Sequence, residues 1–252
     1  MDLTRYVLSL DLGTSSAHAL LIDRLGRTVA TSRTSLRYHR LDEGSDLAKE
    51  FHPAEVMESL SDAVGKTLRQ AAVEPGQIAA VGITTQGQGV VLMGPEDREL
   101  CCSPNIDLRA VFEGAALDEE AGAEIYATTG HAPALLLAPA RLRWLQSHRP
   151  DLMEMASSVV SIGGWLGSRL TGQVAAEASL DCTLGLIDLS TRRHALPMLD
   201  KLGFPVELLP PLLGSGELLG CLRTELAGEW GLPAGLPVTL AGADTVSYTH
   251  LT

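Results

Sequence analysis

Four groups of polar residues in this sequence have the types and spacing that chemistry requires, and the first lies near the N-terminus. Asp11 closes an apolar run and is followed by Gly13, Thr14 and Ser15. A carboxylate at the end of a strand can hold a hydrated cation, while the amides and hydroxyls of a glycine turn can bind a phosphate. An Asp beside a Gly is also common in ordinary turns, so the pattern alone leaves both interpretations open.

The second group is Gln86-Gly87-Gln88-Gly89, which follows an apolar run that predicts a buried strand over residues 78–83. A glutamine side chain both donates and accepts hydrogen bonds, so Gln86 and Gln88 at a strand end suit a polyhydroxylated ligand. A polar turn explains the same residues equally well.

The third group is Asp107 and Arg109, whose side chains share one side of the chain if the segment is extended. Such a pair can contact a ligand, or it can form an internal ion pair at the start of the following helix. The two interpretations are compatible with each other.

The fourth group is Asp244, which follows the apolar run 236–241 and Gly242. An Asp at this place is a preferred N-cap of a helix. It would also serve as a general base, kept ionised by the helix N-terminus and ready to accept a hydroxyl proton. Position alone does not decide between these roles.

The elements that must position these groups are read from apolar periodicity. Apolar runs and a turn at 23–26 predict an antiparallel start, and Pro53 suits the first turn of an amphipathic helix that ends before residue 74. Expected strands are 6–11, 17–23, 28–36, 78–83 and 90–93, and expected helices after the first are 111–127, 141–148, 162–170, 197–202 and 224–230. Residues 174–177 and 183–189 are expected to be extended, and 210–220 to be a loop. The apolar neighbours of Trp144 favour a core anchor over a stacking platform.

Composition limits the classes of protein. The 252 residues, 45% of them hydrophobic and 4% aromatic, fit one large α/β enzyme domain or two small ones. The net charge of −12, without a block of basic residues, argues against nucleic acid or an anionic membrane as partner.

Cysteine usage and apolar segments indicate the compartment. The four cysteines form no CxxC pair, and neighbouring histidines do not supply zinc spacing. Residues 1–6 lack the pattern of a signal peptide, and no apolar window approaches membrane-spanning length. Reduced thiols and a cytoplasmic location are therefore expected.

Taken in order, these motifs resemble the N-terminal domain of an FGGY family carbohydrate kinase, whose fold is similar to actin, hexokinase and the Hsp70 ATPase. The resemblance implies an α/β, ribonuclease H-like (actin-like ATPase) domain with a mixed sheet flanked by helices. It covers nearly the whole chain and rests on Asp11 to Ser15, Gln86 to Gly89, Asp107-Leu108-Arg109, Thr129-Gly130 with Arg141 and Trp144, and Gly242-Ala243-Asp244.

By that resemblance the cofactors are ATP and Mg²⁺, with Asp11 on the metal side and Gly13, Thr14 and Ser15 near the phosphates. Gln86, Gln88, Asp107 and Arg109 belong to the substrate side, and Asp244 corresponds to the catalytic base. The implied reaction is phosphorylation of a sugar or polyol hydroxyl.

One departure from the family concerns the substrate. Gln88 stands where xylulokinases have His and glycerol kinases have Glu, so neither substrate carries over. Ketoses of the xylulose type, tetritols and a linear autoinducer-2-like compound remain open.

The other departure concerns the C-terminal end. Family members continue after the Gly-Ala-Asp-Thr motif into a second domain that holds most of the adenosine pocket, whereas this sequence ends at Thr252. We therefore expect residues 1–246 to form the sugar-side domain, residues 247–252 to be a truncated or non-native tail, and the C-terminal ATP-side domain to be absent. The isolated chain is then expected to be an inactive half.

Two further expectations concern alternatives and assembly. A non-catalytic carbohydrate-binding or regulatory module of the same fold is the competing interpretation, and a chaperone-like or filament-forming member is less favoured. An uncovered apolar cleft wall would favour a homodimer.

Overall fold

The computed structural model of this protein describes residues 5–41 and 47–243. Two predictions, the role of Asp244 and the tail at 247–252, lie outside the described residues.

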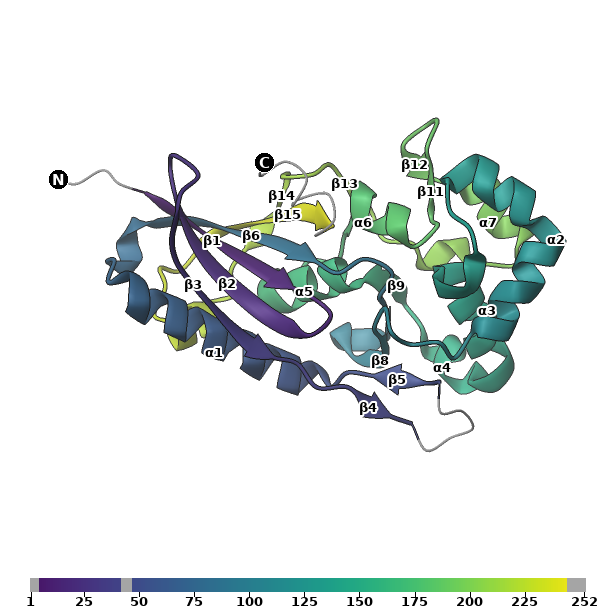
Figure 1. The fold of residues 1–252 in the computed structure, drawn as a ribbon, viewed down its shortest axis with the longest axis horizontal. Helices are drawn as coiled ribbons and strands as arrows, with labels where there is room; N and C mark the ends of the chain where they lie inside the picture. Colours follow the sequence, from purple (N-terminus) through teal and green to yellow (C-terminus); the bar gives the residue numbers. More distant parts are fainter. Residues whose placement is uncertain (1–4, 42–46, 244–252) are drawn as a thin grey trace.

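The described residues form a mixed six-stranded sheet at one end of the molecule (Figure 1). Its strand order is β14-β15-β6-β1-β2-β3. β1 runs antiparallel to β2 and parallel to β6, and β15 runs parallel to β6. The carboxyl ends of β1, β6 and β15 therefore meet at one edge. The strands are β1 (Tyr6–Leu12), β2 (Ser16–Asp23), β3 (Thr28–Ser35), β6 (Ile78–Thr85), β14 (Leu218–Cys221) and β15 (Pro237–Ala243).

Three helices, α1 (Pro53–Ala71), α5 (Ile162–Thr171) and α8 (Thr224–Trp230), share one core with this sheet. Alternate residues of β1 point to the same face, and Leu10 is wholly buried there with Leu60 of α1 and Trp165 of α5. Burying a side chain of this size stabilises the fold by about 1.5–3 kcal/mol. Figure 1 shows α1 and α5 lying behind the sheet.

A second sheet of three antiparallel strands, in the order β8-β7-β9, adjoins the first core. Its strands are β7 (Val90–Met93), β8 (Glu99–Ser103) and β9 (Ser158–Ser161). All four residues of β7 are buried, with Val91 and Met93 in the first core and Val90 and Leu92 in a second core. The strand therefore separates two apolar cores, which explains why it is apolar throughout.

The second core is formed mainly by helices and contains Leu117, Leu142 and Leu199. Its helices are α2 (Val111–Thr129), α3 (Ala138–His148), α4 (Pro150–Met155) and α7 (Leu196–Lys201). The remaining elements are short: β4 (His39–Arg40), β5 (Lys49–Glu50), α6 (Ala178–Thr183), β10 (Ala176–Glu177), β11 (Ile187–Asp188), β12 (Arg193–His194), β13 (Leu212–Leu213) and the 3₁₀ turns η1 (Pro75–Gln77), η2 (Pro95–Asp97), η3 (Ala134–Leu136) and η4 (Val206–Leu208).

The expected α/β fold with a mixed sheet and flanking helices is confirmed, but two local predictions are wrong. The stretch 183–189 is not extended throughout, because its first residue, Thr183, belongs to the helix α6. At the start of α6 the buried Glu177 carboxylate accepts hydrogen bonds from the amides of Ser179 and Leu180. The stretch 210–220 is not simply a loop, because β14 pairs with the distant β15 and β13 with β10.

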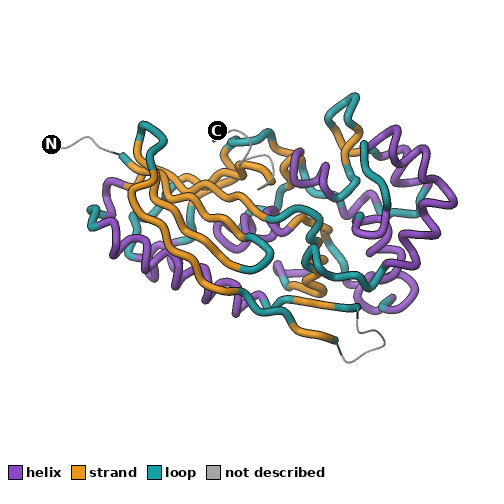
Figure 2. The backbone as a smooth tube through the Cα atoms, viewed as in Figure 1, coloured by secondary structure: helices purple, strands orange, loops and turns teal. Residues whose placement is uncertain are grey.

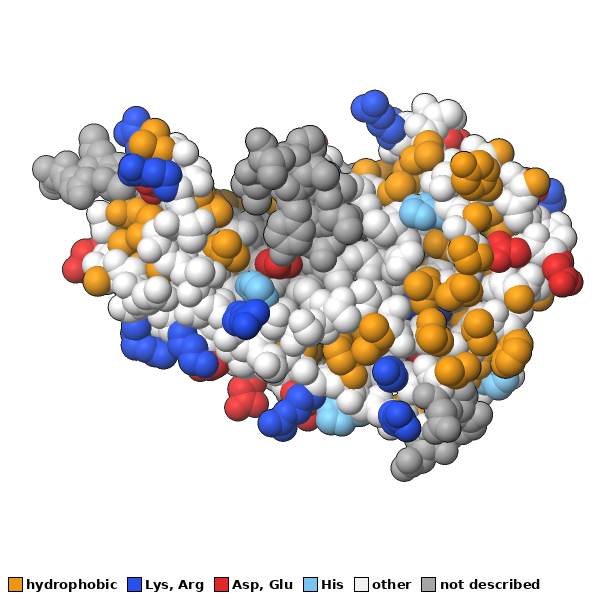
Figure 3. All heavy atoms as spheres, viewed as in Figure 1, with side chains coloured by type: hydrophobic (Ala, Val, Ile, Leu, Met, Phe, Trp, Pro, Cys, Tyr) orange, Lys and Arg blue, Asp and Glu red, His pale blue; other side chains and the backbone are white. Residues whose placement is uncertain are grey.

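The surface carries exposed apolar side chains over α2 and α3, as the space-filling view shows (Figure 3). Phe112 and Tyr126 of α2 are 77% and 61% exposed. Among the helices that the structure describes, none combines the length and the apolar character needed to cross a membrane.

Candidate functional site

Asp11 lies near the carboxyl end of β1, paired with His18 of β2 on one side and Thr84 of β6 on the other. The residue is only 6% exposed. Because β1 and β6 are parallel, the loops that follow them lie side by side at the edge of the sheet (Figure 2). A backbone hydrogen bond from Gln86 N to Leu12 O, 2.9 Å long, joins the two loops where they begin.

The turn after Asp11 is closed by a hydrogen bond from Gly13 N to Ser16 O, 3.1 Å long. Two side chains from elsewhere hold Thr14: the Tyr38 hydroxyl donates to its carbonyl oxygen over 2.5 Å, and Asn105 Nδ2 donates to its Oγ1 over 2.8 Å. Ser15 is exposed. The turn is therefore fixed by its neighbours and presents the Ser15 hydroxyl outward.

Tyr38 and Asn105 were given no role by the sequence, and only the fold brings them to the turn. Burial raises the pKa of the Tyr38 phenol above its ordinary value, while the hydrogen bond with Gln86 opposes that rise. The neutral phenol is thus the form that holds Thr14 at physiological pH.

The predicted substrate-side residue Gln86 is 3% exposed and joins three segments. Its Nε2 donates to Gly13 O over 3.3 Å and to the Tyr38 hydroxyl over 3.4 Å, while its Oε1 accepts from Asn105 N over 3.4 Å. In this arrangement Gln86 holds the turn and the Asn105 segment together. Direct contact between Gln86 and a substrate stays a prediction.

Gln88 is half-buried and has a φ of 61°, a backbone conformation that residues other than glycine rarely adopt. Its amide nitrogen donates to Thr183 Oγ1 over 3.0 Å, and its carbonyl oxygen accepts from Arg141. Backbone strain of this kind costs about 1–3 kcal/mol and concentrates at functional sites. Contact between the Gln88 side chain and a ligand stays a prediction.

Asp107 and Arg109 form a buried ion pair, with Arg109 Nε 2.7 Å from Asp107 Oδ2. Asp107 also accepts hydrogen bonds from the Ser103 hydroxyl and from the amide of Lys49. Arg109 additionally pairs with Glu50 at 2.9 Å. The internal ion pair considered from the sequence is therefore present, and contact of either residue with a substrate stays a prediction.

Trp144 is half-buried and lies against this pair, with the Arg109 guanidinium carbon 5.2 Å from its ring centroid. On the same helix its ring stacks on His148, with centroids 4.5 Å apart. The core-anchor prediction for Trp144 is therefore only partly right, because the ring also makes a cation–π contact with the Arg109 guanidinium.

Arg141 resembled the family pattern in the sequence but received no role there, and the structure gives it one. Its residue exposure is 1%, and its guanidinium donates to the carbonyl oxygens of Gln88, Pro104 and Asp107. Burial lowers the pKa of Arg141 to about 10, with the Asp107 carboxylate opposing that fall. Arg141 thus fixes the Gln88 loop against the Asp107 segment.

The end of β15, which directly precedes Asp244 in the sequence, is fixed at the same sheet edge. Thr84 Oγ1 donates to Gly242 O over 2.8 Å, and Ala243 N donates to Ser179 Oγ over 3.2 Å. Ser179 in turn donates to the buried carboxylate of Glu177 over 2.7 Å. The role of Asp244 as a base stays a prediction, because that residue lies outside the described ranges.

The residues at this edge suit Mg²⁺ and a polyphosphate. Mg²⁺ in proteins takes one or two carboxylates together with water and phosphate oxygens, and the Asp11 carboxylate at a strand end offers such a ligand. The adjoining turn supplies a glycine and the exposed Ser15 hydroxyl for phosphate oxygens. This donor set fits a hard cation with a phosphate, and the binding of Mg²⁺ and ATP at this edge stays a prediction.

Comparison with known proteins gives a family. Residues 6–249 match the FGGY family of carbohydrate kinases, N-terminal domain. The chain is 32% identical over 243 residues to the autoinducer-2 kinase of Escherichia coli (strain K12), a match that covers 95% of this chain and 46% of that protein. The chain thus spans about half the length of the curated relatives it matches.

Solved structures agree with the fold. The xylulose kinase from Rhodospirillum rubrum superposes with a TM-score of 0.87 at 25% identity, over 97% of this chain and 50% of that one. The Plasmodium falciparum glycerol kinase, solved with ADP, superposes with a TM-score of 0.83 at 18% identity, over 97% of this chain and 49% of that one. At 18% identity the second match shows the fold alone.

Proposed function

The chain belongs to the FGGY family of carbohydrate kinases, and from that membership we propose that it supplies the sugar side of an enzyme that phosphorylates a sugar or polyol with ATP. Because the chain spans about half the length of its curated relatives, the proposal concerns the activity of the whole protein. The isolated chain is proposed to bind ligands at its sugar side and to turn over little or nothing.

The observation that carries the proposal is the hydrogen-bonded continuity between the Asp11 turn and the loops assigned to the substrate. Asn105, two residues before Asp107, holds Thr14, and Gln86 bridges Gly13 and Asn105. We infer that the proposed carboxylate and phosphate corner and the proposed sugar-side loop share one hydrogen-bonded edge. Phosphoryl transfer needs this proximity, because catalysis depends mainly on positioning and charge neutralisation.

In the proposed reaction the substrate hydroxyl loses its proton to Asp244 and its oxygen forms a bond to the γ-phosphorus of ATP. The bond between that phosphorus and the bridging oxygen breaks, and ADP leaves. Asp11 would hold Mg²⁺, which supplies charge neutralisation when bound, and Gly13, Thr14 and Ser15 would lie beside the phosphates. Gln88 is the proposed contact with the substrate.

Asp107 and Arg109 are proposed to act first by positioning, because their buried ion pair already engages them within the protein. Loss of positioning alone lowers kcat, whereas loss of a contact made equally in the ground and transition states raises KM. The Asp107→Asn variant of the whole protein therefore decides whether this side chain also touches the substrate.

The proposed substrate class is a short polyhydroxylated ketose or polyol, including xylulose-type ketoses, tetritols and an autoinducer-2-like compound. The resemblance to the Escherichia coli autoinducer-2 kinase supports inclusion of the last compound. The amide of Gln88 supports the class because one amide can both donate to and accept from vicinal hydroxyls.

The test is a coupled ADP-release assay with a panel of ketoses and polyols, applied to the longest protein that the gene encodes. Turnover on at least one member of the panel is expected, with loss on Gln88→Ala. The same panel is then titrated against the isolated chain by tryptophan fluorescence, because Trp144 lies beside Arg109 and reports on that loop. A Trp144→Phe variant provides the control for the signal.

Robust turnover by the isolated chain would contradict the proposal that it is an inactive half. Sugar binding by the whole protein without ATP-dependent transfer would instead support a non-catalytic carbohydrate-binding module.

A further inference from the structure

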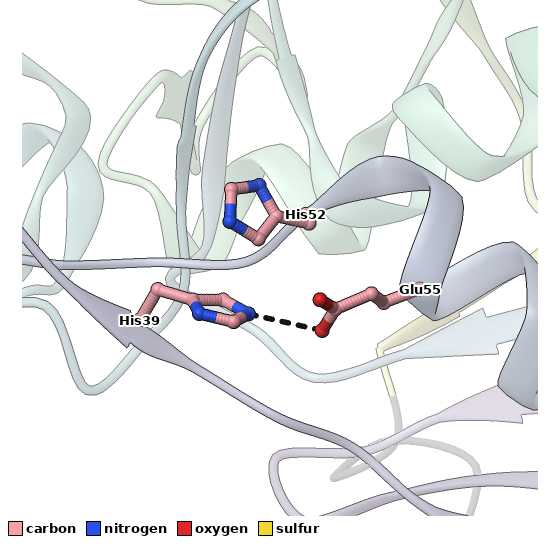
Figure 4. A group of neighbouring side chains, drawn as sticks. All are labelled: His39, His52 and Glu55. Carbon is pink, nitrogen blue, oxygen red and sulfur yellow. Dashed lines mark hydrogen bonds and ion pairs between the residues drawn. The ribbon is translucent and has the colours of Figure 1, made fainter.

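A second cluster of potential ligands lies away from the Asp11 edge, where β4 approaches the start of α1. His39, His52 and Glu55 each offer one ligand atom, and these atoms all lie within 4.8 Å of one another. Figure 4 shows the three side chains close together, with the His39 ring directed at the Glu55 carboxylate and the His52 ring beside them; His39 Nε2 is 2.9 Å from Glu55 Oε2. The imidazole rings of His39 and His52 lie with centroids 4.0 Å apart.

The fold brings these residues together by two local arrangements. His52 is the residue that precedes α1, and Glu55 stands in the first turn of that helix, so their side chains neighbour each other at the helix start. His39 opens β4, which pairs antiparallel with β5 so that His39 is opposite Glu50. The three ligands thus come from two elements that are separate in sequence.

We propose that His39, His52 and Glu55 form a binding site for a divalent transition-metal ion, with Zn²⁺ as the expected occupant. Two imidazole nitrogens and a carboxylate are a common ligand set for zinc, whereas Mg²⁺ and Ca²⁺ select oxygen ligands. Water supplies the fourth position, since His52 is exposed and the other two residues are half-buried.

The three ligand atoms, which lie within 4.8 Å of one another, must come closer together to bind a zinc ion. Two ligand atoms on a tetrahedral zinc ion lie about 3.4 Å apart, given metal–ligand distances of about 2.0–2.1 Å. The His39–Glu55 separation of 2.9 Å already approaches that value, and the exposed ring of His52 can turn toward the pair. Turning of the His52 ring is therefore the adjustment that the proposed site needs.

The charges around the cluster set the conditions for binding. The hydrogen bond from His39 holds the pKa of Glu55 below its ordinary value, with His52 and Arg37 also contributing favourable charge. An ionised carboxylate and neutral imidazole nitrogens are the forms that bind such an ion. Arg37 is a nearby fixed positive charge, and it weakens cation binding without removing it.

A bound ion would join the β4–β5 hairpin to α1. β5 carries Lys49, whose amide donates to Asp107, and Glu50, which pairs with Arg109. The ion would therefore fix the hairpin that supports the Asp107–Arg109 pair. This binding site does not depend on the proposed kinase activity and is tested without it.

The test measures Zn²⁺ binding to the untagged chain at pH 7.5 by isothermal titration, with Co²⁺ absorption as a second readout. One Zn²⁺ per chain is expected at this site, with affinity reduced about tenfold or more in His39→Gln, His52→Gln and Glu55→Gln. Matched controls are His148→Gln and Glu58→Gln, which change an exposed residue of each type outside the cluster and are expected to leave affinity unchanged.

A competing zinc site would use a cysteine thiolate, because Cys182 Sγ lies 3.9 Å from His131 Nε2. The proposed site contains no thiolate, so its Co²⁺ complex lacks the intense sulfur-to-metal absorption in the near ultraviolet, and Cys182→Ser binds normally. Zinc affinity that survives both His39→Gln and His52→Gln, or that is lost in Cys182→Ser, would overturn the proposal. His52 is exposed, so His52→Gln keeps the test decisive even if His39→Gln folds poorly.

Discussion

Asn105 donates a hydrogen bond to the hydroxyl oxygen of Thr14 across 91 residues of sequence, with Nδ2 and Oγ1 2.8 Å apart. This bond joins the loop that carries Asp107 to the turn that follows Asp11. It therefore couples the two halves of the proposed site, and the strength of that coupling can be measured.

Replacing Asn105 by Ala is expected to lower the free energy of unfolding by about 1 kcal/mol, the typical net value of such a hydrogen bond. Urea unfolding of Asn105→Ala, Thr14→Ala and the double variant measures the coupling directly. Thr14→Ser keeps the hydroxyl and serves as the control. Strict additivity of the two alanine substitutions would show that the bond contributes nothing.

Arg109→Met is expected to be among the most destabilising changes in this region. It leaves the Asp107 carboxylate buried without its ion-pair partner, and breaking a buried pair in this way costs about 3–5 kcal/mol. Urea unfolding of Arg109→Met, compared with Asp107→Leu/Arg109→Met, gives the measurement. The double variant is expected to be the more stable of the two, since it removes the uncompensated charge.

Arg109→Lys separates charge from geometry in the same pair. Lysine keeps the positive charge, but it cannot reproduce the planar guanidinium that bonds Asp107 and Glu50 and lies over Trp144. Stability equal to wild type in Arg109→Lys would mean that charge alone matters here.

Regular secondary structure could be predicted from the sequence, whereas features that depend on long-range contacts could not. The stripe of apolar residues in α1 and the alternation in β1 and β2 follow local rules, so these elements are found nearly at their observed bounds. The strand that carries Asp11 and the strand that precedes Gln88 follow from the same rules, whereas the site roles of Asp11, Gln88 and Asp107 stay predictions.

Other features depend on partners that are far away in the sequence. Arg141 looks like a surface residue of a short helix, and only its three backbone carbonyl partners reveal why it is buried. The strand β14 depends on pairing with β15, which lies further along the chain. The His39, His52 and Glu55 cluster shows no ligand spacing in the sequence, because a hairpin brings its first member to the other two.

Tyr38 predicts a specific dependence of stability on alkaline pH. Burial raises the pKa of its phenol in the folded state above 10.0, so the unfolded chain ionises first as the pH rises. The unfolded state then binds fewer protons, and the free energy of unfolding falls as the pH passes through the folded-state pKa. Below pH 10.0 this contribution is fully present.

Urea unfolding between pH 8 and about 11 is the measurement, with Tyr38→Phe as the control that cannot ionise. The wild type is expected to lose stability more steeply than Tyr38→Phe over the upper part of this range. Parallel pH profiles would show that the phenol is not perturbed. At neutral pH, Tyr38→Phe is expected to cost about 1 kcal/mol, because Thr14 O loses its donor.

Two substitutions at Gln88 distinguish the effect of backbone strain on stability from the effect of the side chain on sugar affinity. Its φ of 61° favours glycine, so Gln88→Gly is expected to leave the free energy of unfolding within about 1 kcal/mol of wild type, or to raise it. Gln88→Ala removes the amide but keeps the strained backbone. Both variants are expected to lose sugar affinity in the Trp144 fluorescence titration, and unchanged affinity in both would remove Gln88 from the proposed site.

Gly242 provides the last test, because it lies at the end of β15 immediately before Ala243 and the proposed base. Its φ is 98°, and a Cβ at this position would stand 2.6 Å from Ser179 Oγ, the atom that accepts a hydrogen bond from Ala243 N. Gly242→Ala is therefore expected to displace Ser179 and to lower the free energy of unfolding by more than about 1 kcal/mol.

Gly235 is the matched control, since its φ is 76° and a Cβ there meets nothing within 4 Å. Gly235→Ala carries the backbone strain without the contact, so the excess loss of stability in Gly242→Ala measures the crowding against Ser179. In the whole protein Gly242→Ala is expected to lower kcat more than it raises KM, because in the proposed mechanism the strand end positions the base and does not bind the sugar. If Gly242→Ala and Gly235→Ala lost stability and activity equally, Ser179 would have no part in positioning this strand end.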